Sequence, residues 1–253
     1  MAFDVPADAY DRFMGRYSVQ LVPQMLELAG VRAGQSALDV GCGPGALTTG
    51  LVEVLGADHV VAVDPSAPFV AANRARNPGV EVQQASAEQL PFDSGRFDGA
   101  LAQLVVHFMT DPVAGLREMG RVVHPGGIVA ACVWDGGGRS PIASFWRVAQ
   151  SIDPAALDES ALNGAREGHL AELFKAANLG DIQDAVLSAA LDYNDFDTWW
   201  QPFTLGVGRA GEYFQSRDER GRDALRDGCR ELLGPPPFTI SAQAWAVKGL
   251  SVG

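Results

Sequence analysis

The sequence predicts a doubly wound α/β fold, in which a seven-stranded and mostly parallel sheet carries helices on both faces. Between residues 36 and 134, short apolar segments alternate five times with segments of helical periodicity. A glycine-rich turn joins the first predicted strand to the helix that follows it. Two later segments, 182–193 and 238–247, alternate in polarity and are expected to complete the sheet around helical insertions that form a cap.

Composition and charge exclude several classes of protein. The 253 residues, 47% hydrophobic and 20% charged, suffice for one large globular α/β domain. A net charge of −12 without any basic run argues against a nucleic-acid partner, which requires clustered lysine and arginine. The apolar stretches are too short to span a membrane, and residues 1–11 lack the basic start and apolar core of a signal peptide.

The cysteines point to a reduced environment. Cys42, Cys132 and Cys229 are odd in number and widely spaced, so they indicate neither a disulfide framework nor a metal site. We therefore expect a cytoplasmic protein without a metal. From the charge and the apolar stretches we expect no nucleic-acid partner and no membrane, and the protein is expected to be a monomer or homodimer.

The first helical segment covers residues 7–30. Gly15 and Pro23 are expected to divide it into two helices or a helix and a loop, because these residues interrupt helical hydrogen bonding. Its apolar residues recur at spacings of three and four: Tyr10, Phe13, Met14, Tyr17, Leu21, Val22, Met25 and Leu28.

The glycine-rich turn lies within residues 36–49. A short apolar strand at 37–40 is followed by Gly41, Gly43 and Gly45, and then by a helix with one apolar face. Glycines without a Cβ let the backbone N–H groups approach a ligand closely, and the following helix adds a partial positive field. Three glycines in five residues exceed what packing a helix on a strand requires.

Asp39 helps to choose the ligand of this turn. The loose pattern G-x-G-x-x-[GA] is shared by dinucleotide and other nucleoside binders, but Asp39 would repel a pyrophosphate held on the loop. A cationic ligand without a phosphate would not be repelled. The pattern Asp-x-Gly-x-Gly-x-Gly closely resembles motif I of class I S-adenosylmethionine-dependent methyltransferases.

This resemblance implies S-adenosylmethionine as the cofactor, with Asp39, Gly41, Cys42 and Gly43 at its site. It also implies the strand order 3-2-1-4-5-7-6 with strand 7 antiparallel. The residues Tyr-Asp-Arg-Phe-Met-Gly-Arg-Tyr near the N-terminus resemble the lid of small-molecule methyltransferases. Arg16 is then either a partner of a cofactor carboxylate or a surface arginine whose stem packs on aromatic rings.

The second predicted strand, 59–63, ends at Asp64. A carboxylate at this position accepts the hydroxyl protons of a ribose in nucleotide-binding folds, and in the resemblance Asp64 is motif II. The alternative role is a helix N-cap, because Pro65 follows at a favourable first helical position. Ser66 is a second cap candidate, and Pro65 and Ser66 are also expected to contact the cofactor.

The third strand, 80–84, is followed by Ser86-Ala87-Glu88. This tripeptide resembles the methyltransferase loop that clamps adenine, in which an acidic residue precedes alanine. Ser86 departs from that pattern, and its hydroxyl would bind the adenine amino group more weakly than a carboxylate. Glu88 would then compensate, and a plain turn is the alternative.

The fourth strand, 97–106, is almost entirely apolar and is therefore expected to be buried on both faces. Gln103 is its polar exception and should lie beside the ligand at the carboxyl edge of the sheet. His107 follows four residues later. It is either a packed loop histidine or a general base that takes a proton from the substrate, for which its near-neutral pKa is suited.

A fourth helix, a fifth strand and the cap complete the chain. Asp111-Pro112 starts the helix, His124 lies in the turn after it, and 128–134 is the fifth strand. Beyond it, short helices are expected over 141–180 and one charged helix over 210–233. The aromatic residues between 145 and 203 either line an apolar substrate pocket or form core.

The predicted function is methyl transfer from S-adenosylmethionine to an oxygen, nitrogen or carbon of a small molecule, which leaves S-adenosylhomocysteine. Residues 1–30 would form a lid, 31–134 the cofactor-binding core and 135–253 the substrate cap with the last two strands. The alternatives are an NAD-type oxidoreductase on a similar fold, and a cofactor-binding protein without catalysis.

Overall fold

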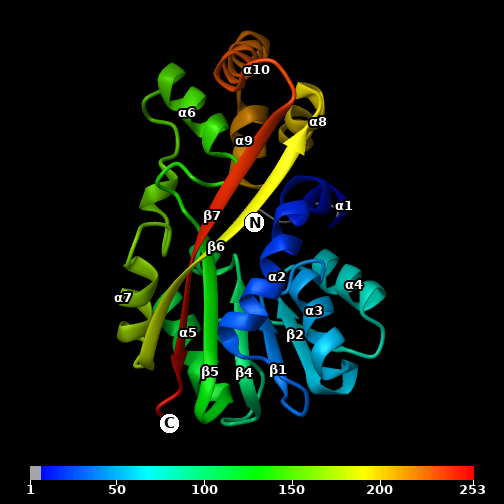
Figure 1. Cartoon of the computed structure of the whole chain (residues 1–253), viewed down its shortest axis with the longest axis vertical. Helices are drawn as coiled ribbons and strands as arrows, with labels where there is room; N and C mark the ends of the chain where they lie inside the picture. Colours follow the sequence, from blue (N-terminus) through cyan, green and yellow to red (C-terminus); the bar gives the residue numbers. More distant parts are fainter. Residues whose placement is uncertain (1–6) are drawn as a thin grey trace.

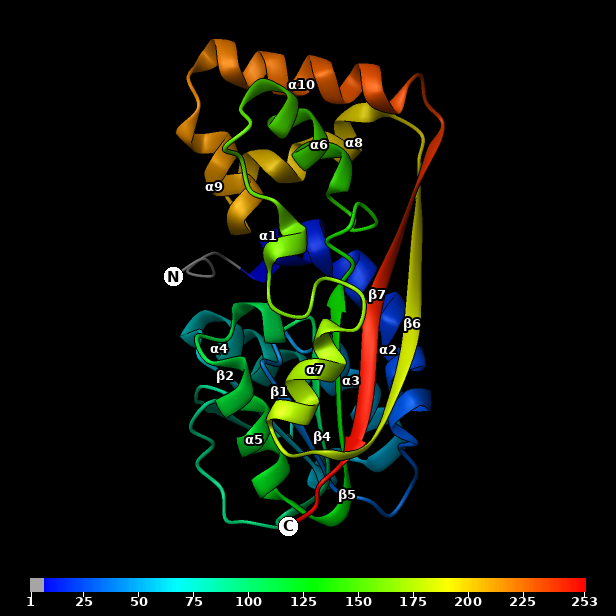
Figure 2. The same cartoon turned by 90° about the vertical axis from the view of Figure 1, so that its left-hand side faces the viewer.

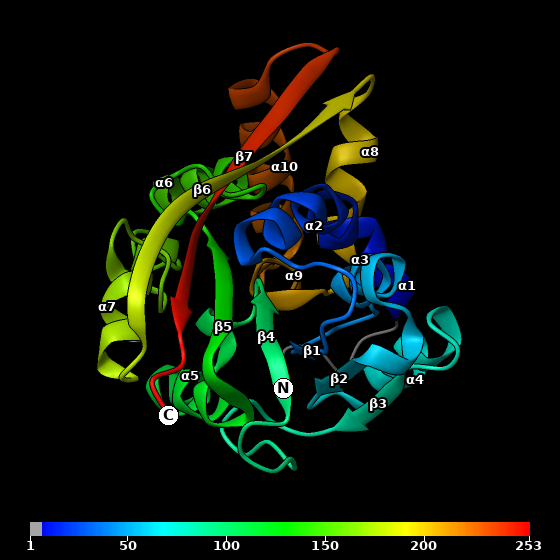
Figure 3. The same ribbon diagram turned by 60° about the horizontal axis from the view of Figure 1, so that its bottom comes forward.

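The computed structural model describes residues 7–253, so the first six residues of the predicted lid lie outside the described residues. Within that range, seven strands form one sheet in the order β3-β2-β1-β4-β5-β7-β6 (Figure 1). All neighbouring pairs are parallel except those of β7, which runs antiparallel to both β5 and β6. Figure 3 displays this order from β3 to β6. The predicted fold class and strand order are confirmed.

The central strands carry apolar side chains on both faces. They are β1 (Ala37–Val40), β2 (Val60–Asp64) and β4 (Phe97–Gln103), beside β3 (Glu81–Gln84). Strand β4 ends at Gln103, three residues earlier than predicted. Leu104 adopts a φ of +64°, which turns the backbone away from the ladder, and a short helical turn η3 (Val106–Phe108) follows.

Helix α3 (Ala46–Leu55) connects β1 to β2, α4 (Ala67–Arg76) connects β2 to β3, and α5 (Pro112–Val122) follows β4. Asp111 caps α5 as predicted, since its carboxylate accepts from Ala114 N at 2.9 Å. The N-cap of α4 is Ser66, whose hydroxyl accepts from Phe69 N. The prediction that Asp64 might cap this helix is wrong, because Asp64 still belongs to β2.

The N-terminal helical segment is continuous rather than divided. It consists of α1 (Ala7–Tyr10), a π-helical turn η1 (Asp11–Gly15) and α2 (Arg16–Ala29). The predicted break at Pro23 is wrong, because Pro23 lies inside α2. Burial of Leu21 and Met25 on either side of it fixes the helix against the sheet and outweighs one lost hydrogen bond.

The last three strands are long. They are β5 (Val123–Trp134), β6 (Gly180–Tyr193) and β7 (Phe238–Leu250). Strand β5 was predicted over 128–134 but starts at Val123, so His124, which was predicted to lie in a turn, belongs to the strand. Strand β6 is an edge strand, and helix α2 covers part of that edge (Figure 1). The side-chain amide of Gln20 donates to the carbonyl oxygen of Ala190 and accepts from its N–H. The side-chain amide of Gln24 makes the same two hydrogen bonds with Ser188. These hydrogen bonds satisfy the backbone groups of two residues on the open edge of β6, which a neighbouring strand would otherwise pair.

A group of helices lies beyond the carboxyl ends of the parallel strands (Figure 2). It contains α6 (Ala143–Ile152), α8 (Phe196–Trp200), η5 (Gln201–Leu205), α9 (Gly208–Ser216) and α10 (Glu219–Leu233), whereas η4 (Glu159–Ala161) and α7 (His169–Ala176) lead back to the sheet. The single helix predicted over 210–233 is wrong: Arg217 and Asp218 are extended, and Asp218 caps α10. No helix among residues 7–253 has the length and apolarity to cross a membrane.

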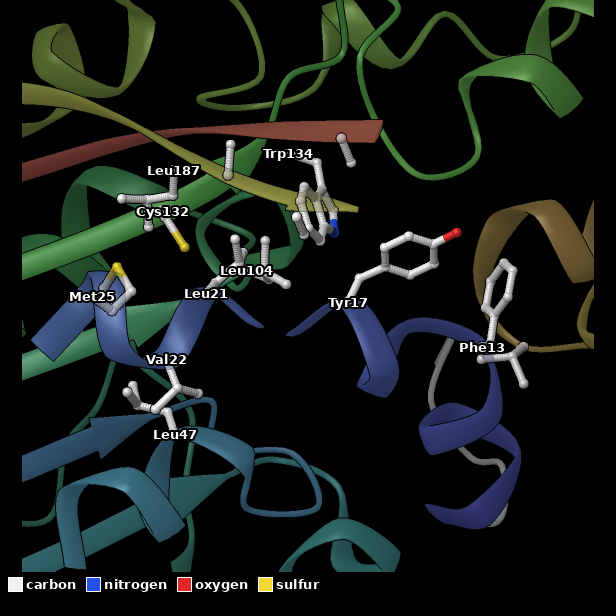
Figure 4. Packing of buried hydrophobic residues seen from close by; sticks show 14 of the residues in the cluster. Phe13, Tyr17, Leu21, Val22, Met25, Leu47, Leu104, Cys132, Trp134 and Leu187 are labelled. Carbon is white, nitrogen blue, oxygen red and sulfur yellow. The ribbon is translucent and has the colours of Figure 1, made fainter. Parts of the chain in front are cut away.

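Most of the aromatic cluster forms core. Phe145, Trp199, Trp200 and Phe203 are at most 5% exposed and pack on one another, with the rings of Phe145 and Phe203 stacked at 4.8 Å. This cluster joins the cap to the hydrophobic core that runs along α2. Figure 4 shows the core along α2, in which Met25 faces Cys132 on one side of the helix and Val22 lies beside Leu47 on the other.

Candidate functional site

Four neighbouring strands end at one cleft. Gly41, Asp64, Gln84 and Gln103 lie at or just after the carboxyl ends of β1, β2, β3 and β4, and all four line a cavity of about 510 Å³. Parallel strands of an open sheet bring their carboxyl ends to the same edge, which is where such folds bind ligands. The sequence patterns at 36–49, 64 and 103 therefore converge in space.

The glycine turn forms the floor of this cleft. Gly41 N and Cys42 N donate to the carbonyl oxygen of Val63 at 2.8 and 2.9 Å, which ties the turn to β2. A Cβ on Gly41 would lie 2.5 Å from the side chain of Val105. A Cβ on Gly43 would meet no protein atom within 4 Å, and Gly43 has a φ of +53°. Gly41 is thus required by packing, whereas Gly43 leaves ligand space open.

Asp64 connects the turn to the cleft. Its carboxylate accepts from Gly43 N at 2.9 Å and from Ser66 N at 2.8 Å, so it orders both the glycine turn and the start of α4. Burial raises the pKa of Asp64, against the lowering effect of these two backbone donors. Each oxygen keeps a second acceptor site, because a carboxylate oxygen has two lone pairs.

Gln103 contributes an unsatisfied acceptor. Its Nε2 donates to the carbonyl oxygen and hydroxyl of Ser18 in α2, at 3.0 and 2.8 Å. Its Oε1 is buried and has no hydrogen-bond partner among the described residues. A buried acceptor of this kind is costly unless a ligand donates to it.

Asp39 and Cys42 lie behind the turn and do not line the cleft. Asp39 accepts from Thr48 Oγ1 at 2.6 Å, and Thr48 accepts in turn from Asn73 Nδ2 at 2.8 Å. Burial raises the pKa of Asp39 to about 7, so its negative charge is only partly present at neutral pH. The expected electrostatic repulsion of a pyrophosphate is correspondingly weaker than the sequence suggested.

The other proposed cofactor residues are divided between the cleft and its surroundings. Pro65 and Ser66 line the cleft, but Ser86, Ala87 and Glu88 do not. The carboxylate of Glu88 accepts from Thr110 N at 2.8 Å and so positions the segment before α5. Residues 86–88, which resemble an adenine-binding loop in the sequence, therefore do not line the cleft.

Arg16 also lies outside the cleft. Its guanidinium is 4.9 Å from the ring centroid of Tyr193 and donates weakly to the carbonyl of Thr198 at 3.5 Å. The structure therefore matches the alternative in which the arginine packs on aromatic rings. Nearby, the hydroxyls of Tyr17 and Tyr193 share a buried hydrogen bond of 2.7 Å.

Sequence reasoning missed several residues of the cleft wall. Gln84 is a polar residue at the end of its strand, as Asp64 and Gln103 are at the ends of theirs. This position in the sequence could have predicted that Gln84 lines the cleft. Arg209 comes from α9, far along the chain, and no local pattern marks it. The missed lining residues are Tyr10, Ala67, Pro68, Phe69, Gln84, Leu104, Val105, Phe108 and Arg209.

A smaller and mainly apolar cavity of about 70 Å³ adjoins the cleft. Tyr10, Leu104, Phe108 and Arg209 line both spaces. The lid residue Phe13 and Trp134 at the end of β5 also line the smaller one; Figure 4 shows both with Tyr17 between them. Of the predicted aromatic wall residues between 145 and 203, Trp146 lines it.

His107 lies in this apolar cavity. Its Nδ1 is buried and has no partner among the described residues, and its ring packs against Phe108 at 3.8 Å between centroids. Burial, aided by the charge of Arg209, lowers the pKa of His107 to about 3. The imidazole is therefore neutral at physiological pH, but it is a much weaker base than an ordinary histidine.

Glu159 is a second titratable group in the apolar cavity. Its carboxyl accepts from Ser140 Oγ at 2.5 Å, and burial raises the pKa of Glu159 to about 7, although Arg209 acts in the opposite direction. No group of three or more potential metal ligands occurs within residues 7–253. The site combines a cleft of backbone and polar groups with an apolar cavity that is also lined by His107, Glu159 and Arg209.

Comparison with known proteins shows which protein family residues 38–131 match. The family model described as "Methyltransferase domain" matches residues 38–131, which include the glycine turn, Asp64 and Gln103. The prediction of a class I S-adenosylmethionine-dependent methyltransferase domain is thereby confirmed for residues 38–131.

Two curated relatives belong to the same family. An uncharacterized methyltransferase of Mycobacterium tuberculosis is 35% identical over 135 residues, 53% of this chain and 52% of the relative. A malonyl-[acyl-carrier protein] O-methyltransferase of Pseudescherichia vulneris is 32% identical over 152 residues, 59% of each chain. The chain thus spans about half the length of the curated relatives it matches.

A solved structure shares the fold over almost the whole chain. It is a phosphoethanolamine-type N-methyltransferase of Haemonchus contortus in complex with phosphomonomethylethanolamine and S-adenosylhomocysteine. It aligns with a TM-score of 0.59 and 14% identity, covering 98% of this chain and 57% of that one. At this identity the likeness supports the fold alone.

Proposed function

Because residues 38–131 are a class I methyltransferase domain, we propose that the chain transfers a methyl group from S-adenosylmethionine to a small molecule. The observation that carries this proposal is the convergence of Gly43, Asp64 and Gln103 on one cleft at the carboxyl edge of the sheet. The cleft offers a carboxylate, an unpaired amide oxygen and glycine backbone, which suit a cationic amino-acid nucleoside.

The residues of the cleft fit this cofactor. Asp64 would accept hydrogen bonds from the ribose hydroxyls through its remaining lone pairs. The buried Oε1 of Gln103 would accept from the amino group of the methionine part. The open space above Gly43 would admit the ligand close to the backbone. When bound, the cofactor supplies an activated methyl group on a sulfonium.

The protein's own contribution is mainly positioning. An activated methyl needs an aligned nucleophile, and alignment in a closed site contributes up to ~7–11 kcal/mol in favourable cases. Residues 31–134 would hold the cofactor, and 135–253 would hold the acceptor. Residues 1–30 would act as a lid that excludes water, with Tyr10 and Phe13 above the two cavities.

The set of cofactor contacts is narrower than the sequence indicated. Six of the proposed contacts line the cleft: Gly41, Gly43, Asp64, Pro65, Ser66 and Gln103. The roles of the other expected contacts are indirect, through the glycine turn or the segment before α5; these residues are Asp39, Cys42, Ser86, Ala87 and Glu88. Arg16 would help to hold the lid against Tyr193.

An oxidoreductase and a protein without catalysis are the alternatives. A carboxylate such as Asp64 also binds the ribose of NAD, so this residue alone does not discriminate. The family match favours the methyl donor. The apolar cavity beside the cleft offers a place for an acceptor next to the cofactor, which favours catalysis over cofactor binding alone. The monomeric or dimeric state and the cytoplasmic location stay predictions.

Isothermal calorimetry with S-adenosylhomocysteine and NADH tests the cofactor. We expect saturable binding of S-adenosylhomocysteine and no binding of NADH; the reverse result would support the oxidoreductase. Methyl transfer to a panel of phenols, amines and carboxylic acids then tests catalysis. Binding of S-adenosylhomocysteine without turnover on any acceptor would favour the non-catalytic alternative.

A further inference from the structure

Arg209 lies at the junction of the two cavities and forms no close ion pair with any described residue, although its charge acts on Glu159 in the same cavity. Within residues 7–253 it makes neither a hydrogen bond nor an ion pair; its guanidinium carbon lies 5.9 Å from the ring centroid of Phe108. Several other arginines of the cap pair with carboxylates, as Arg217 does with Asp153 and Arg226 with Asp197. Acidic residues outnumber basic ones by 31 to 19 in this chain, so an unpaired arginine is conspicuous.

The chemistry of the guanidinium specifies the ligand. Arginine is always charged and presents its N–H donors in a planar fork that matches two oxygens of an anion. Placed at the wall of an apolar cavity, it attracts an anionic oxygen more strongly than it would in water. A neutral ligand would leave the charge partly desolvated without a partner.

The neighbouring ionisable groups favour the same ligand. His107 is neutral and does not repel or neutralise an anion. Glu159 shares the cavity with Arg209 but forms no ion pair with it, and its elevated pKa lets it take up a proton when an anion arrives. As a protonated acid it would donate a hydrogen bond to the ligand rather than repel it.

The location of Arg209 relates the anion to the reaction. Arg209, Tyr10, Leu104 and Phe108 line both the cleft proposed for the cofactor and the apolar cavity. A group held at this junction lies where the methyl donor and its acceptor would meet. The anion is therefore placed as the reacting group rather than as a distant anchor.

We propose that the methyl acceptor is a small apolar acid whose anionic oxygen, a carboxylate or an acidic phenolate, is bound by Arg209. This inference rests on the proposed function. The oxygen attacks the sulfonium methyl carbon, so a C–O bond forms while the C–S bond breaks. The electron pair of the broken bond stays on sulfur, which leaves S-adenosylhomocysteine as a neutral thioether. The product is a methyl ester or methyl ether, and no proton has to be removed.

Calorimetry on the full chain saturated with S-adenosylhomocysteine tests this proposal without turnover. The probes are benzoate and 4-nitrophenolate, with benzamide and benzyl alcohol as neutral counterparts. We expect at least one acid to bind tenfold or more tightly than its neutral counterpart, and the better acid identifies the carboxylate or the phenolate as the preferred source. Equal binding of acids and neutral molecules, or no binding of either, would overturn the proposal.

Two variants locate the effect. Arg209→Met should lower the affinity for the preferred acid about tenfold or more, while the affinity for S-adenosylhomocysteine stays within about twofold. The matched control is Arg220→Met, which removes an exposed arginine of α10 and should change neither affinity. If Arg209→Met weakens S-adenosylhomocysteine instead, Arg209 belongs to the cofactor site and the proposal is wrong. If the unchanged protein fails to bind S-adenosylhomocysteine, the proposed function itself fails.

Discussion

The side-chain amide of Gln103 donates two hydrogen bonds to Ser18, one to the carbonyl oxygen at 3.0 Å and one to the hydroxyl at 2.8 Å. Gln103 ends β4, and Ser18 lies in α2, so these bonds fasten the proposed lid to the carboxyl edge of the sheet. The amide oxygen of the same side chain is buried and unpaired. A single residue thus contacts both the proposed lid and the cleft, and we expect it to couple the position of the lid to ligand binding.

Replacement of Gln103 should loosen the lid. Gln103→Leu keeps the side-chain volume but removes both hydrogen bonds, which should lower the free energy of unfolding by ~1–3 kcal/mol and speed amide exchange in α2. Hydrogen exchange followed by mass spectrometry measures this. The control is Gln84→Leu, because Gln84 lines the same cleft but donates to Pro65 rather than to the lid. Equal exchange of α2 in both variants would argue against the coupling.

Ligand binding should slow exchange in the same segment of the unchanged protein. If residues 7–29 close over the cleft, S-adenosylhomocysteine should protect their amides. Exchange rates that are the same with and without S-adenosylhomocysteine would indicate a static helix instead of a lid.

Asp64 should contribute directly to cofactor affinity. We expect Asp64→Ala to weaken S-adenosylhomocysteine binding by ~1.5–3 kcal/mol, the scale of hydrogen bonds to a charged group. Asp64→Asn should lose less, because its amide oxygen can still accept from Gly43 N or from Ser66 N. Asp58→Ala, at an exposed position just before β2, is the control. Calorimetry that finds Asp64→Ala unchanged would remove Asp64 from the site.

Gly43 should be sensitive for a different reason. Gly43→Ala places a methyl group in the open space of the cleft and should reduce S-adenosylhomocysteine affinity about tenfold or more. The φ of +53° also imposes a strain of about 1 kcal/mol on any side chain. Gly30→Ala carries a similar strain at φ +65° with no contact within 4 Å, but it lies at the end of α2 away from the cleft. A similar loss of affinity in both variants would mean that strain rather than ligand contact is responsible.

The sequence predicted the central part of the fold because local and global signals agree there. Glycine turns, caps and buried strands over 36–134 are short-range features, and each is present in the structure. Errors arose where tertiary packing outweighs local preference. Pro23 stays helical because α2 is packed on the sheet, and Arg217–Asp218 interrupt a charged segment that has helical periodicity throughout.

The site was predictable only along the strand ends. Asp64 and Gln103 are marked by their positions after apolar runs, and Gln84 carries the same mark. Arg209 and Glu159 lie in cap segments whose placement over the cleft depends on long-range contacts, so no spacing along the chain reveals them. Ser86 and Glu88 resemble a binding loop, but the direction of their side chains depends on the turn before β4.

Asp39 should make stability depend on pH. Its pKa is raised from 3.8 to about 7 in the folded protein, so the folded state binds its proton more tightly than the unfolded state. Stability from this group is fully present below pH 4 and is lost as the pH rises to about 7, by at most about 4 kcal/mol. The Asn side chain of Asp39→Asn cannot ionise.

The measurement is chemical denaturation of both proteins between pH 4 and 8. The free energy of unfolding of Asp39→Asn minus that of the unchanged protein should rise across this range, because only the unchanged protein loses stability through Asp39. Carboxyl groups that do not interact with Asp39 cancel in the difference, whereas Asp64 interacts with Asp39 and contributes to it. A constant difference would mean that Asp39 titrates normally despite its burial.

Replacement of His107 distinguishes two mechanisms, general-base catalysis by the histidine and methyl transfer to an acceptor that is already ionised. A general base typically contributes ~10²–10⁴-fold, but efficient bases have a pKa near the working pH. Burial and Arg209 hold the pKa of His107 at about 3, and an acid bound by Arg209 is already ionised, so no proton needs a base. On the preferred acid, we therefore expect His107→Gln to keep turnover within about tenfold of the unchanged protein.

The pH profile and a comparison variant complete this test. With a pKa of about 3, His107 should produce no acid limb in turnover between pH 5 and 8, since its protonation state does not change there. Arg209→Met should reduce turnover on the same acid far more than His107→Gln does, because it removes the group that holds the reacting oxygen. A loss of ~10²–10⁴-fold in His107→Gln, together with an acid limb near pH 6.5 in the unchanged protein, would instead identify His107 as the base. The acceptor would then be a protonated hydroxyl or amine, because only such a group needs a proton removed before methyl transfer.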